Sequence, residues 1–509
     1  MKAQRSLFCA LLFCVLPFSM ASAQSPDQDR EAALFGGEGD DAGSSTASSD
    51  EEGARDKALF GSGESIQLET SESIDSKLEE AGETLEMGGT AYLRLMQNFA
   101  DSSDPDDDRF SSPNLLDLYL DARRSENLRF FTRARMSYNA TAQAQTEGSF
   151  GQSVEPTSVD LDQFWMKFNI DRKLFVTAGK QPIKWGAGRF WNPTDFLNQQ
   201  RRDPLAIFDR RLGQALLKLH LPIESLGWNF YAVGNFESVQ RVQELGVGLR
   251  LEMVFGLTEV TISGAGRASK RNSADATEPA GDAPLRIGAD ISSALGPFDV
   301  WLEAAAIRYP ERSYWTGEFD FEDRKLPDEL QYTDDWVLQA VTGFEFGLRY
   351  SDQDTVYFGG EYFYNDGGYS DADLYPWLIW QGEYVPFYVG KNYASAYMLL
   401  YAPGDWNDSS FVLSGIGNLS DGSYVGRFDY QLSVLTHLSL NLYAAYHFGA
   451  DGEFFLPLDI PGVELTEEQV DEYGLPEVVK DFIADGSLAE GTRLAAPLVD
   501  LGLWLRMSF

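Results

Sequence analysis

Basic side chains recur at alternate positions in the first part of this chain. Arg129, Arg133 and Arg135 lie among apolar residues such as Phe130 and Ala134. Side chains of an extended strand alternate between its two faces, so this spacing gathers the charges on one face. A hydrated wall of fixed charges can select solutes by its electric field. The residues predicted to share this inward face are Arg94, Arg123, Arg129, Arg133, Arg135, Lys167, Asp117 and Asp121.

This charged face admits two interpretations. In the first, the acidic and basic side chains pair with one another and only hydrate the wall. In the second, the arginines clustered on the first three predicted strands form a basic strip that favours anionic or dipolar solutes. The sequence leaves both interpretations open.

Residues for catalysis or cofactor binding form no recognisable pattern. The three histidines, His220, His437 and His447, stand apart from any nucleophile or metal-binding motif. The acidic turn at 104–108 lacks the glycine and the terminal glutamate of an EF-hand, so we expect a solvated turn there. No phosphate-binding loop or dinucleotide fingerprint occurs. The chain is therefore predicted not to be an enzyme and to need no metal or cofactor.

Alternating stretches of about ten residues, each followed by a turn, fill the chain from Leu85 onward. One face is apolar and the other polar, as in strands that separate lipid from a wet lumen. The predicted fold class is all-β, a transmembrane antiparallel up-and-down β-barrel over residues 85–509. About 18 strands (16–18) are expected, since single-chain bacterial barrels have an even number. After three strands within 85–138, the predicted ranges are 157–170, 173–182, 212–221, 226–238, 242–254, 257–267, 284–295, 297–309, 335–350, 354–365, 390–401, 406–418, 422–434, 438–448 and 497–509.

The connections between these strands alternate in length. Short turns occur at 124–127, 171–173, 255–256 and 296–297, whereas the intervening connections are mostly long. Short periplasmic turns and long external loops are typical of outer-membrane barrels, so both ends of the barrel domain are expected in the periplasm. The long connections cover 140–156, 183–211, 268–283, 310–334, 366–389 and 449–496.

The final strand places an apolar face beside a charged one and ends in an aromatic residue. Leu501, Leu503 and Leu505 alternate with Trp504 and other inward residues, and the chain finishes at Phe509. This ending resembles the C-terminal signal by which the outer-membrane assembly machinery recognises its β-barrel clients. Trp504 and Phe509 are the predicted elements of that signal.

The N-terminal 84 residues divide into two segments. Residues 1–23 combine a positive start, a short apolar run and a small-residue cleavage site, which predicts a secretory signal peptide. Residues 24–84 are acidic and poor in large apolar residues, which predicts a disordered periplasmic segment. The sequence Ala-Leu-Phe-Gly occurs in it at 33–36 and 58–61. This repeat is either a chance echo or a pair of docking motifs for a periplasmic partner.

The formal net charge of −39 argues against nucleic acid as a partner. Both cysteines, Cys9 and Cys14, fall within the predicted signal peptide, so the mature chain has no thiol. The expected partners are outer-membrane lipid and lipopolysaccharide, the barrel-assembly machinery, and small solutes. The expected location is the bacterial outer membrane.

Aromatic residues and paired charges are unusually dense in the connection at 183–211. Such a loop is expected to fold inward against the wall and narrow the pore. Its Trp-Gly-x-Gly and Trp-Asn-Pro-x-Asp elements, which follow Gly179-Lys180-Gln181, resemble a segment of poorly characterised porin-like barrels. The width and the lumenal arginines also resemble the alginate-export porins. The candidate constriction residues are Trp185, Arg189, Trp191, Asn192, Asp195, Arg201, Arg202, Arg210 and Arg211.

Two further loops contain features of their own. Tyr375, Trp377, Trp380 and Tyr384 form an aromatic group that either fills the core of a lid or guides sugars and hydrophobic solutes. The connection at 449–496 contains two predicted short helices, near 465–474 and 475–483, that could cap the pore.

The leading functional prediction is an outer-membrane porin-like channel for passive diffusion of small hydrophilic solutes, anionic ones among them. Charges on a wall without a nucleophile suit passage better than reaction. One alternative is a dedicated export or uptake barrel for polysaccharides or sugar acids, in which Arg94, Arg129, Arg133 and Arg135 would contact an anionic sugar. The other is a non-conducting surface adhesin or structural barrel.

Overall fold

The structure is a computed structural model that describes most of the chain from Leu85 to Phe509. Residues 1–84 fall outside the described part, so the predicted signal peptide and acidic segment stay predictions. The same holds for the helices predicted at 465–474 and 475–483. Within 85–509, the residues not described are 126, 143–155, 199, 207–210, 268–283, 309–313, 320–324, 326, 331–335, 352–353, 382 and 461–491.

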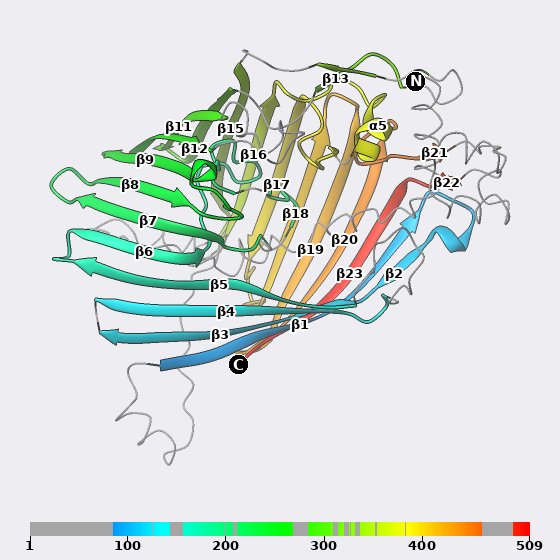
Figure 1. Cartoon of the computed structure of the whole chain (residues 1–509). Coiled ribbons are helices and arrows are strands. Elements are labelled where there is room, and N and C mark those ends of the chain that lie inside the picture. The colour runs from blue at the N-terminus through cyan, green and yellow to red at the C-terminus, as the bar shows by residue number, and fades with distance from the viewer. Residues whose placement is uncertain are drawn as a thin grey trace.

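Eighteen long strands form the wall of the molecule (Figure 1). Their bounds are β1 Leu85–Ala100, β3 Pro113–Ser125, β4 Leu128–Asn139, β5 Thr157–Ile170, β6 Leu174–Gln181, β7 Gln214–Ile223, β8 Trp228–Asn235, β9 Gly246–Phe255, β10 Thr258–Gly266, β11 Leu285–Leu295, β12 Phe298–Arg308, β15 Trp336–Arg349, β16 Thr355–Asn365, β17 Asn392–Tyr401, β18 Ser409–Asn418, β19 Ser423–Leu435, β20 Leu438–Gly449 and β23 Pro497–Ser508. The short elements are η1 Pro105–Asp107, β2 Arg109–Ser111, η2 Val242–Glu244, β13 Tyr314–Thr316, β14 Asp328–Leu330, α5 Tyr375–Gln381, β21 Leu458–Ile460 and β22 Thr492–Leu494.

The wall is a closed antiparallel barrel. Each long strand pairs with the next one along the chain, and β1 pairs with β23 from Thr90↔Ser508 to Ala100↔Pro497. This last pairing joins the first and last strands and leaves the sheet without an open edge. The predicted fold class and strand number are therefore confirmed.

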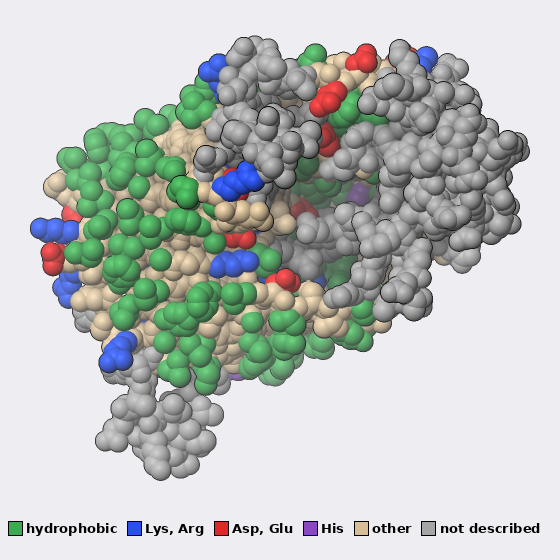
Figure 2. Space-filling model, viewed as in Figure 1, with side chains coloured by type: hydrophobic (Ala, Val, Ile, Leu, Met, Phe, Trp, Pro, Cys, Tyr) green, Lys and Arg blue, Asp and Glu red, His purple; other side chains and the backbone are tan. Residues whose placement is uncertain are grey.

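Alternation in the sequence determines which side chains face outward. On four successive strands Leu249, Ile262, Ile287 and Leu302 are each about half exposed on the outer surface. Figure 2 shows hydrophobic side chains over the outer surface and charged ones mainly near the rim. A barrel with this apolar exterior and a charged interior suits a lipid environment. Among the described residues, no helix is long and apolar enough to cross a membrane.

The short turns all lie at one end of the barrel, called here the turn end, and the long connections lie at the other, the loop end. The predicted turns at Gly256 and Gly296 have φ of +66° at both glycines, a conformation that glycine adopts without strain. At the turn end Gly89 N donates to Phe509 O at 2.8 Å and Phe509 N donates to Gly89 O at 3.0 Å. The terminal aromatic residue is thus held on β1.

Glycine is required where an aromatic ring lies flat on the inner wall. A Cβ added to Gly502 on β23 would come within 1.8 Å of the Tyr443 ring on β20. A Cβ on Gly264 of β10 would meet only ordinary contacts, the nearest being Arg286 O at 3.5 Å. The ring of Tyr443 therefore depends on the missing side chain beside the closing strand.

We predict that Gly502→Ala destabilises the barrel by about 1–3 kcal/mol because the Tyr443 ring must shift in a packed wall. Gly264→Ala is the matched control and should leave stability nearly unchanged. Urea unfolding of the refolded proteins, followed by tryptophan fluorescence, measures the difference. Equal midpoints for the two variants would contradict this account of Gly502.

Candidate functional site: a basic wall and an inner loop

The predicted basic residues of the first strands form ion pairs on the inner wall. Arg135 binds Asp117 through two hydrogen bonds, of 2.9 and 3.1 Å. Arg123 and Arg129 both bind Asp121, at 2.7 and 3.0 Å. Pairing, which was one of the two predicted interpretations, is therefore observed for these arginines.

A β-bulge adds an acidic residue that simple alternation places on the outside. The register between β4 and β5 shifts between Arg133 and Ala134, which lets Asp162 and Gln163 both face inward. Arg133 Nε then donates to Asp162 Oδ2 at 2.7 Å, and Arg135 lies 3.5 Å from the same atom. The sequence analysis missed Asp162. The sequence contains one indication of the bulge. The outward apolar residues stand at odd positions up to Leu161 and at even positions from Phe164 onward.

The ion pairs do not bury all the positive charge. The side chains of Arg123, Arg129 and Arg133 are 57%, 28% and 33% exposed, whereas Asp121 and Asp162 behind them are each 3% exposed. Lys167, which is opposite Arg129 in the strand register, is partly exposed. On this part of the wall, the basic side chains are therefore more exposed to the lumen than Asp121 and Asp162. This set is called the basic wall below: Arg123, Arg129, Arg133, Arg135 and Lys167 with Asp117, Asp121 and Asp162.

Aromatic rings support the basic wall. Phe131 stacks on Trp165 with ring centroids 5.3 Å apart, and the guanidinium of Arg129 lies 5.2 Å from the Trp165 centroid. Arg94 is fully buried farther round the wall, with its guanidinium 5.7 Å from the ring of Trp504. Arg94 and Trp504 thus pack together beside the closing seam.

Two wall glutamates hold the connection between β6 and β7 inside the barrel. This inner loop comprises residues 182–213. Glu303 on β12 accepts hydrogen bonds from the backbone N–H groups of Ala187 at 2.9 Å and Thr194 at 2.6 Å, and from the Thr194 hydroxyl at 2.9 Å. Gly188 N also donates to it at 3.1 Å. One buried carboxylate therefore binds two separate parts of the inner loop, residues 187–188 and Thr194.

Glu361 on β16 binds the next part of the same loop. Its carboxylate accepts bonds from the backbone N–H groups of Arg189, of Phe190 at 2.7 Å and of Trp191 at 3.3 Å. Trp301 Nε1 donates to it at 2.7 Å. Hydrogen bonds to a charged acceptor are stronger than neutral ones. The two carboxylates therefore act as anchors for an otherwise irregular loop.

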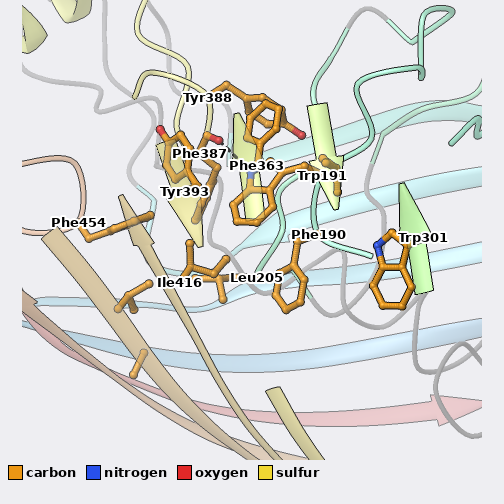
Figure 3. Close-up of a cluster of buried hydrophobic side chains, with 13 residues drawn as sticks. Phe190, Trp191, Leu205, Trp301, Phe363, Phe387, Tyr388, Tyr393, Ile416 and Phe454 are labelled. Atoms are coloured by element: carbon orange, nitrogen blue, oxygen red, sulfur yellow. Dashed lines mark hydrogen bonds between the residues drawn. The ribbon is translucent and has the colours of Figure 1, made fainter. Parts of the chain in front are cut away.

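Apolar packing extends this attachment along the wall. Trp185, Phe196 and Leu197 pack with residues of β7, β8, β10 and β12. Trp191 is fully buried and stacks on Phe363 of β16 at 5.4 Å, as Figure 3 shows. Trp191 Nε1 also donates to Phe387 O at 3.0 Å. The inner loop therefore packs against the part of the wall that lies opposite β3 to β5 in the barrel.

The other predicted constriction residues take part in the same loop structure. Asn192 Nδ2 donates to Gly188 O at 2.8 Å, and Arg202 Nη1 donates to Arg189 O at 3.0 Å. Arg211 Nη1 binds Asp195 Oδ2 at 2.7 Å. The guanidinium of Arg189 lies 5.3 Å from the Trp301 ring centroid.

Among the described arginines of this set, Arg201 is the exposed one, with its guanidinium 5.4 Å from the Tyr388 ring centroid. Arg210 lies outside the described residues. Gly213 N donates to the backbone O of Asp162 at 3.1 Å, which ties the end of the inner loop to the basic wall. The inward folding is thus seen, and a constriction of solute flow remains a proposal.

The predicted aromatic loop packs at the loop end as a compact core. Tyr375 and Trp377 are buried on α5, and Trp377 makes an edge contact with Trp315 at 5.1 Å. Tyr384 makes an edge contact with Tyr375 at 5.6 Å. Trp380 lies on α5, and its side chain is outside the described residues. This packing matches the lid-core interpretation.

Glu453 joins three loops at the same end. Its carboxylate accepts hydrogen bonds from Phe387 N, from Tyr393 Oη at 2.6 Å and from Asn418 Nδ2 at 3.0 Å. Its backbone N donates to Asp421 Oδ2 at 2.9 Å. Burial raises the pKa of Glu453 to about 8, and the hydrogen bonds from Tyr393 and Phe387 oppose that rise.

Strand alternation is enough to assign Glu303 and Glu361 to the inner face, but it does not indicate their role. Alternation assigns a side chain to a face, whereas its partner here lies more than one hundred residues away in the chain. Glu453 lies in a connection and has no periodic signal.

Comparison with known proteins adds distant structural likenesses. No protein-family model matches the sequence, and no curated protein matches it. A BenF-like porin from Pseudomonas fluorescens Pf-5 is 10% identical, covers 84% of this chain and 98% of its own, and has a TM-score of 0.46. The outer membrane protein OpdK from Pseudomonas aeruginosa is 9% identical with 84% and 99% covered and a TM-score of 0.44. OprB from Pseudomonas putida is 11% identical with 86% and 96% covered and a TM-score of 0.42.

The strand pairing of the chain itself defines its class. A closed barrel of eighteen antiparallel strands, apolar outside and charged inside, is the fold of an outer-membrane β-barrel. The predicted resemblance to outer-membrane β-barrels is therefore confirmed for the fold.

We predict that the double variant Glu303→Gln/Glu361→Gln releases the inner loop, since neutral amides accept weaker hydrogen bonds than carboxylates. Limited trypsin digestion of the refolded protein, read by mass spectrometry, should then show cleavage after Arg189, Arg201 or Arg202. Asp429→Asn is the control, because that buried carboxylate pairs with Arg427 on its own strand. Unchanged resistance of the double variant would show that apolar packing alone holds the loop.

We predict that the loops joined at Glu453 loosen at alkaline pH. The folded-state pKa is about 8 and lies above the ordinary value of 4.5. The protonated form is therefore favoured by folding, and the stability it contributes falls as pH rises from about 4.5 and is lost above about 8. Hydrogen exchange of residues 384–390 should be more protected at pH 6 than at pH 9. Glu453→Gln should remove most of this pH dependence, and an equal dependence in that variant would assign it to another group.

Proposed function

We propose that this protein is an outer-membrane porin-like channel through which small hydrophilic solutes diffuse passively, with a preference for anions. The observation that carries the proposal is the basic wall. Arg123, Arg129 and Arg133 present partly exposed guanidinium groups to the lumen, while Asp121 and Asp162 lie behind them. A barrel of eighteen strands is wide enough for an aqueous channel unless loops fill it.

The position of the inner loop supports a pathway that is narrower than the barrel and selective for charge. It is fixed along the wall from β7 to β20 by Glu303, by Glu361 and by apolar packing. At its far end Gly213 touches Asp162 of the basic wall. We infer that solutes pass between the inner loop and the basic wall, where fixed positive charge raises the local concentration of anions.

We predict that Arg123→Gln/Arg129→Gln/Arg133→Gln lowers the anion-to-cation permeability ratio. A unit charge at about 8 Å in water contributes about 0.5 kcal/mol, so three charges change the ratio by about two- to tenfold after screening by salt. Arg135 is retained because its guanidinium neutralises buried Asp117. Reversal potentials of refolded mature protein in planar bilayers, under a salt gradient, measure the ratio.

The matched control is Arg124→Gln/Arg172→Gln/Lys173→Gln. It removes three exposed charges from the same end of the barrel but outside the inner face. This control should keep the wild-type ratio. If all three proteins conduct ions with equal selectivity, the basic wall is not the cause of the anion preference. No conductance in any of them would favour a gated exporter or an adhesin.

A further inference from the structure

Basic side chains share one level of the inner wall across five neighbouring strands, β3 to β7 (Figure 1). Arg129 is opposite Arg123 on one side and Lys167 on the other. Thr177 is opposite Lys167 on one side and Lys218 on the other. Neighbouring strands lie about 4.8 Å apart, so these five residues form a continuous line near the turn end. This line is called the basic row below.

The centre of the basic row can hold one oxyanion. Lys167 and Lys218 lie on either side of Thr177, and both lysines are partly exposed. Each ammonium group has three donors on a flexible stem, and the threonine hydroxyl adds one more. The side chain of Arg129, which is 28% exposed, follows on the next strand. Donors from neighbouring strands can therefore converge on a single group of oxygen atoms.

Three rings occupy the next level toward the turn end. Phe175 is opposite His220, and His220 is opposite Tyr231. The rings of His220 and Tyr231 are stacked with centroids 4.5 Å apart, and the Phe175 centroid lies 5.6 Å from that of His220. Asn229 Oδ1 lies 2.9 Å from His220 Nε2 and fixes that ring. The three rings are partly exposed, and they are called the ring row below.

The inner loop packs on β7 farther from the turn end than these two rows. Its cluster around Trp185 includes Leu216, which is 2% exposed. Lys218 and His220 follow Leu216 on the same face of β7 and are partly exposed. Both rows therefore face the lumen at a part of β7 that the inner loop leaves uncovered.

We propose that the basic row and the ring row together bind a small phosphomonoester that carries a flat ring. The phosphate lies over Thr177, between Lys167 and Lys218. The ring packs on His220 and Tyr231. Alternate residues of a strand lie about 7 Å apart on one face, a distance that a ring joined to phosphate through one ester oxygen can span. The inference rests on the proposed channel function, since it names the class of solute that this part of the lumen binds during passage.

The charge of the site favours phosphate over carboxylate. A phosphomonoester carries about 1.5 to 2 negative charges at pH 7 and has three acceptor oxygens, whereas a carboxylate carries one charge. Coulomb attraction to the basic row grows in proportion to that charge. The faces of His220 and Tyr231 contact each other, so a solute meets the ring edges. These edges carry partial positive charge and attract the electron-rich face of another ring.

Equilibrium binding to the refolded full-length mature protein tests this site without any need for ion flow. The probes are phenyl phosphate, methyl phosphate, which lacks the ring, and benzoate, which has the ring but a single charge. Isothermal titration calorimetry at low salt should give an affinity for phenyl phosphate about three- to tenfold above that for either of the other probes. This comparison uses the wild-type protein and does not depend on the folding of a variant.

The variant Lys167→Gln/Lys218→Gln tests the basic row. It should weaken phenyl phosphate by about tenfold and benzoate by less, because the dianion loses more Coulomb energy. The matched control is Arg172→Gln/Lys173→Gln, which removes two charges from the turn between β5 and β6 and should bind all three probes as the wild type does.

The variant Tyr231→Leu tests the ring row. It should weaken phenyl phosphate by about two- to fivefold and leave methyl phosphate unchanged, since only the first probe has a ring. The matched control is Phe230→Leu, which removes a ring that is 36% exposed on the outer surface one residue away. This control should not alter the binding of any probe.

The outcomes separate this inference from the channel proposal. Equal affinities for phenyl phosphate and benzoate, or for phenyl phosphate and methyl phosphate, overturn the inference. Anion-selective conductance in the same preparation then leaves the channel proposal intact. Preferential binding of phenyl phosphate by a protein that does not conduct supports the site and overturns the channel proposal.

Discussion

Two carboxylates on the inner wall, Glu303 and Glu361, determine the interior of this barrel. A carboxylate removed from water costs several kcal/mol unless hydrogen bonds replace its hydration. An irregular loop placed inside a barrel has the same problem with its backbone N–H groups. Here the carboxylates and the backbone N–H groups satisfy one another, because the amides of residues 187–191 and 194 donate hydrogen bonds to the two carboxylates. Without the two carboxylates, these backbone N–H groups would lose the acceptors that they have in this structure.

The fixed loop gives the interior two unlike sides. Along β7 to β20 the wall is covered by Trp185, Trp191 and their apolar neighbours. Along β3 to β5 the wall carries ion-paired arginines that stay partly exposed. Asp162 connects the sides, since it binds Arg133 and also accepts from Gly213. A change in the seating of the loop would therefore alter the electrostatics of the basic wall.

Much of the fold could be predicted because alternation is enforced by the solvents on the two sides of each strand. The bounds of β5 agree with the predicted 157–170, and those of β20 and β23 agree within one residue. The details of the site were less accessible. The inward turn of Asp162 depends on a bulge, and the anchoring by Glu303 and Glu361 depends on contacts between distant segments. Periodicity reports which face a residue occupies and contains no information on its partner.

The proposed anion preference depends on how deeply each charged side chain is buried in the basic wall, and not on the net charge of the chain. The chain has a net charge of −39, so a count of residues predicts a barrel that repels anions. Within the basic wall, however, Asp117, Asp121 and Asp162 lie deeper than Arg123, Arg129 and Arg133. A solute in the lumen is nearer to the guanidinium groups, and Coulomb energy falls with distance. We therefore propose that the field beside the basic wall is positive, because its buried carboxylates hold Arg123, Arg129 and Arg133 while these arginines stay more exposed.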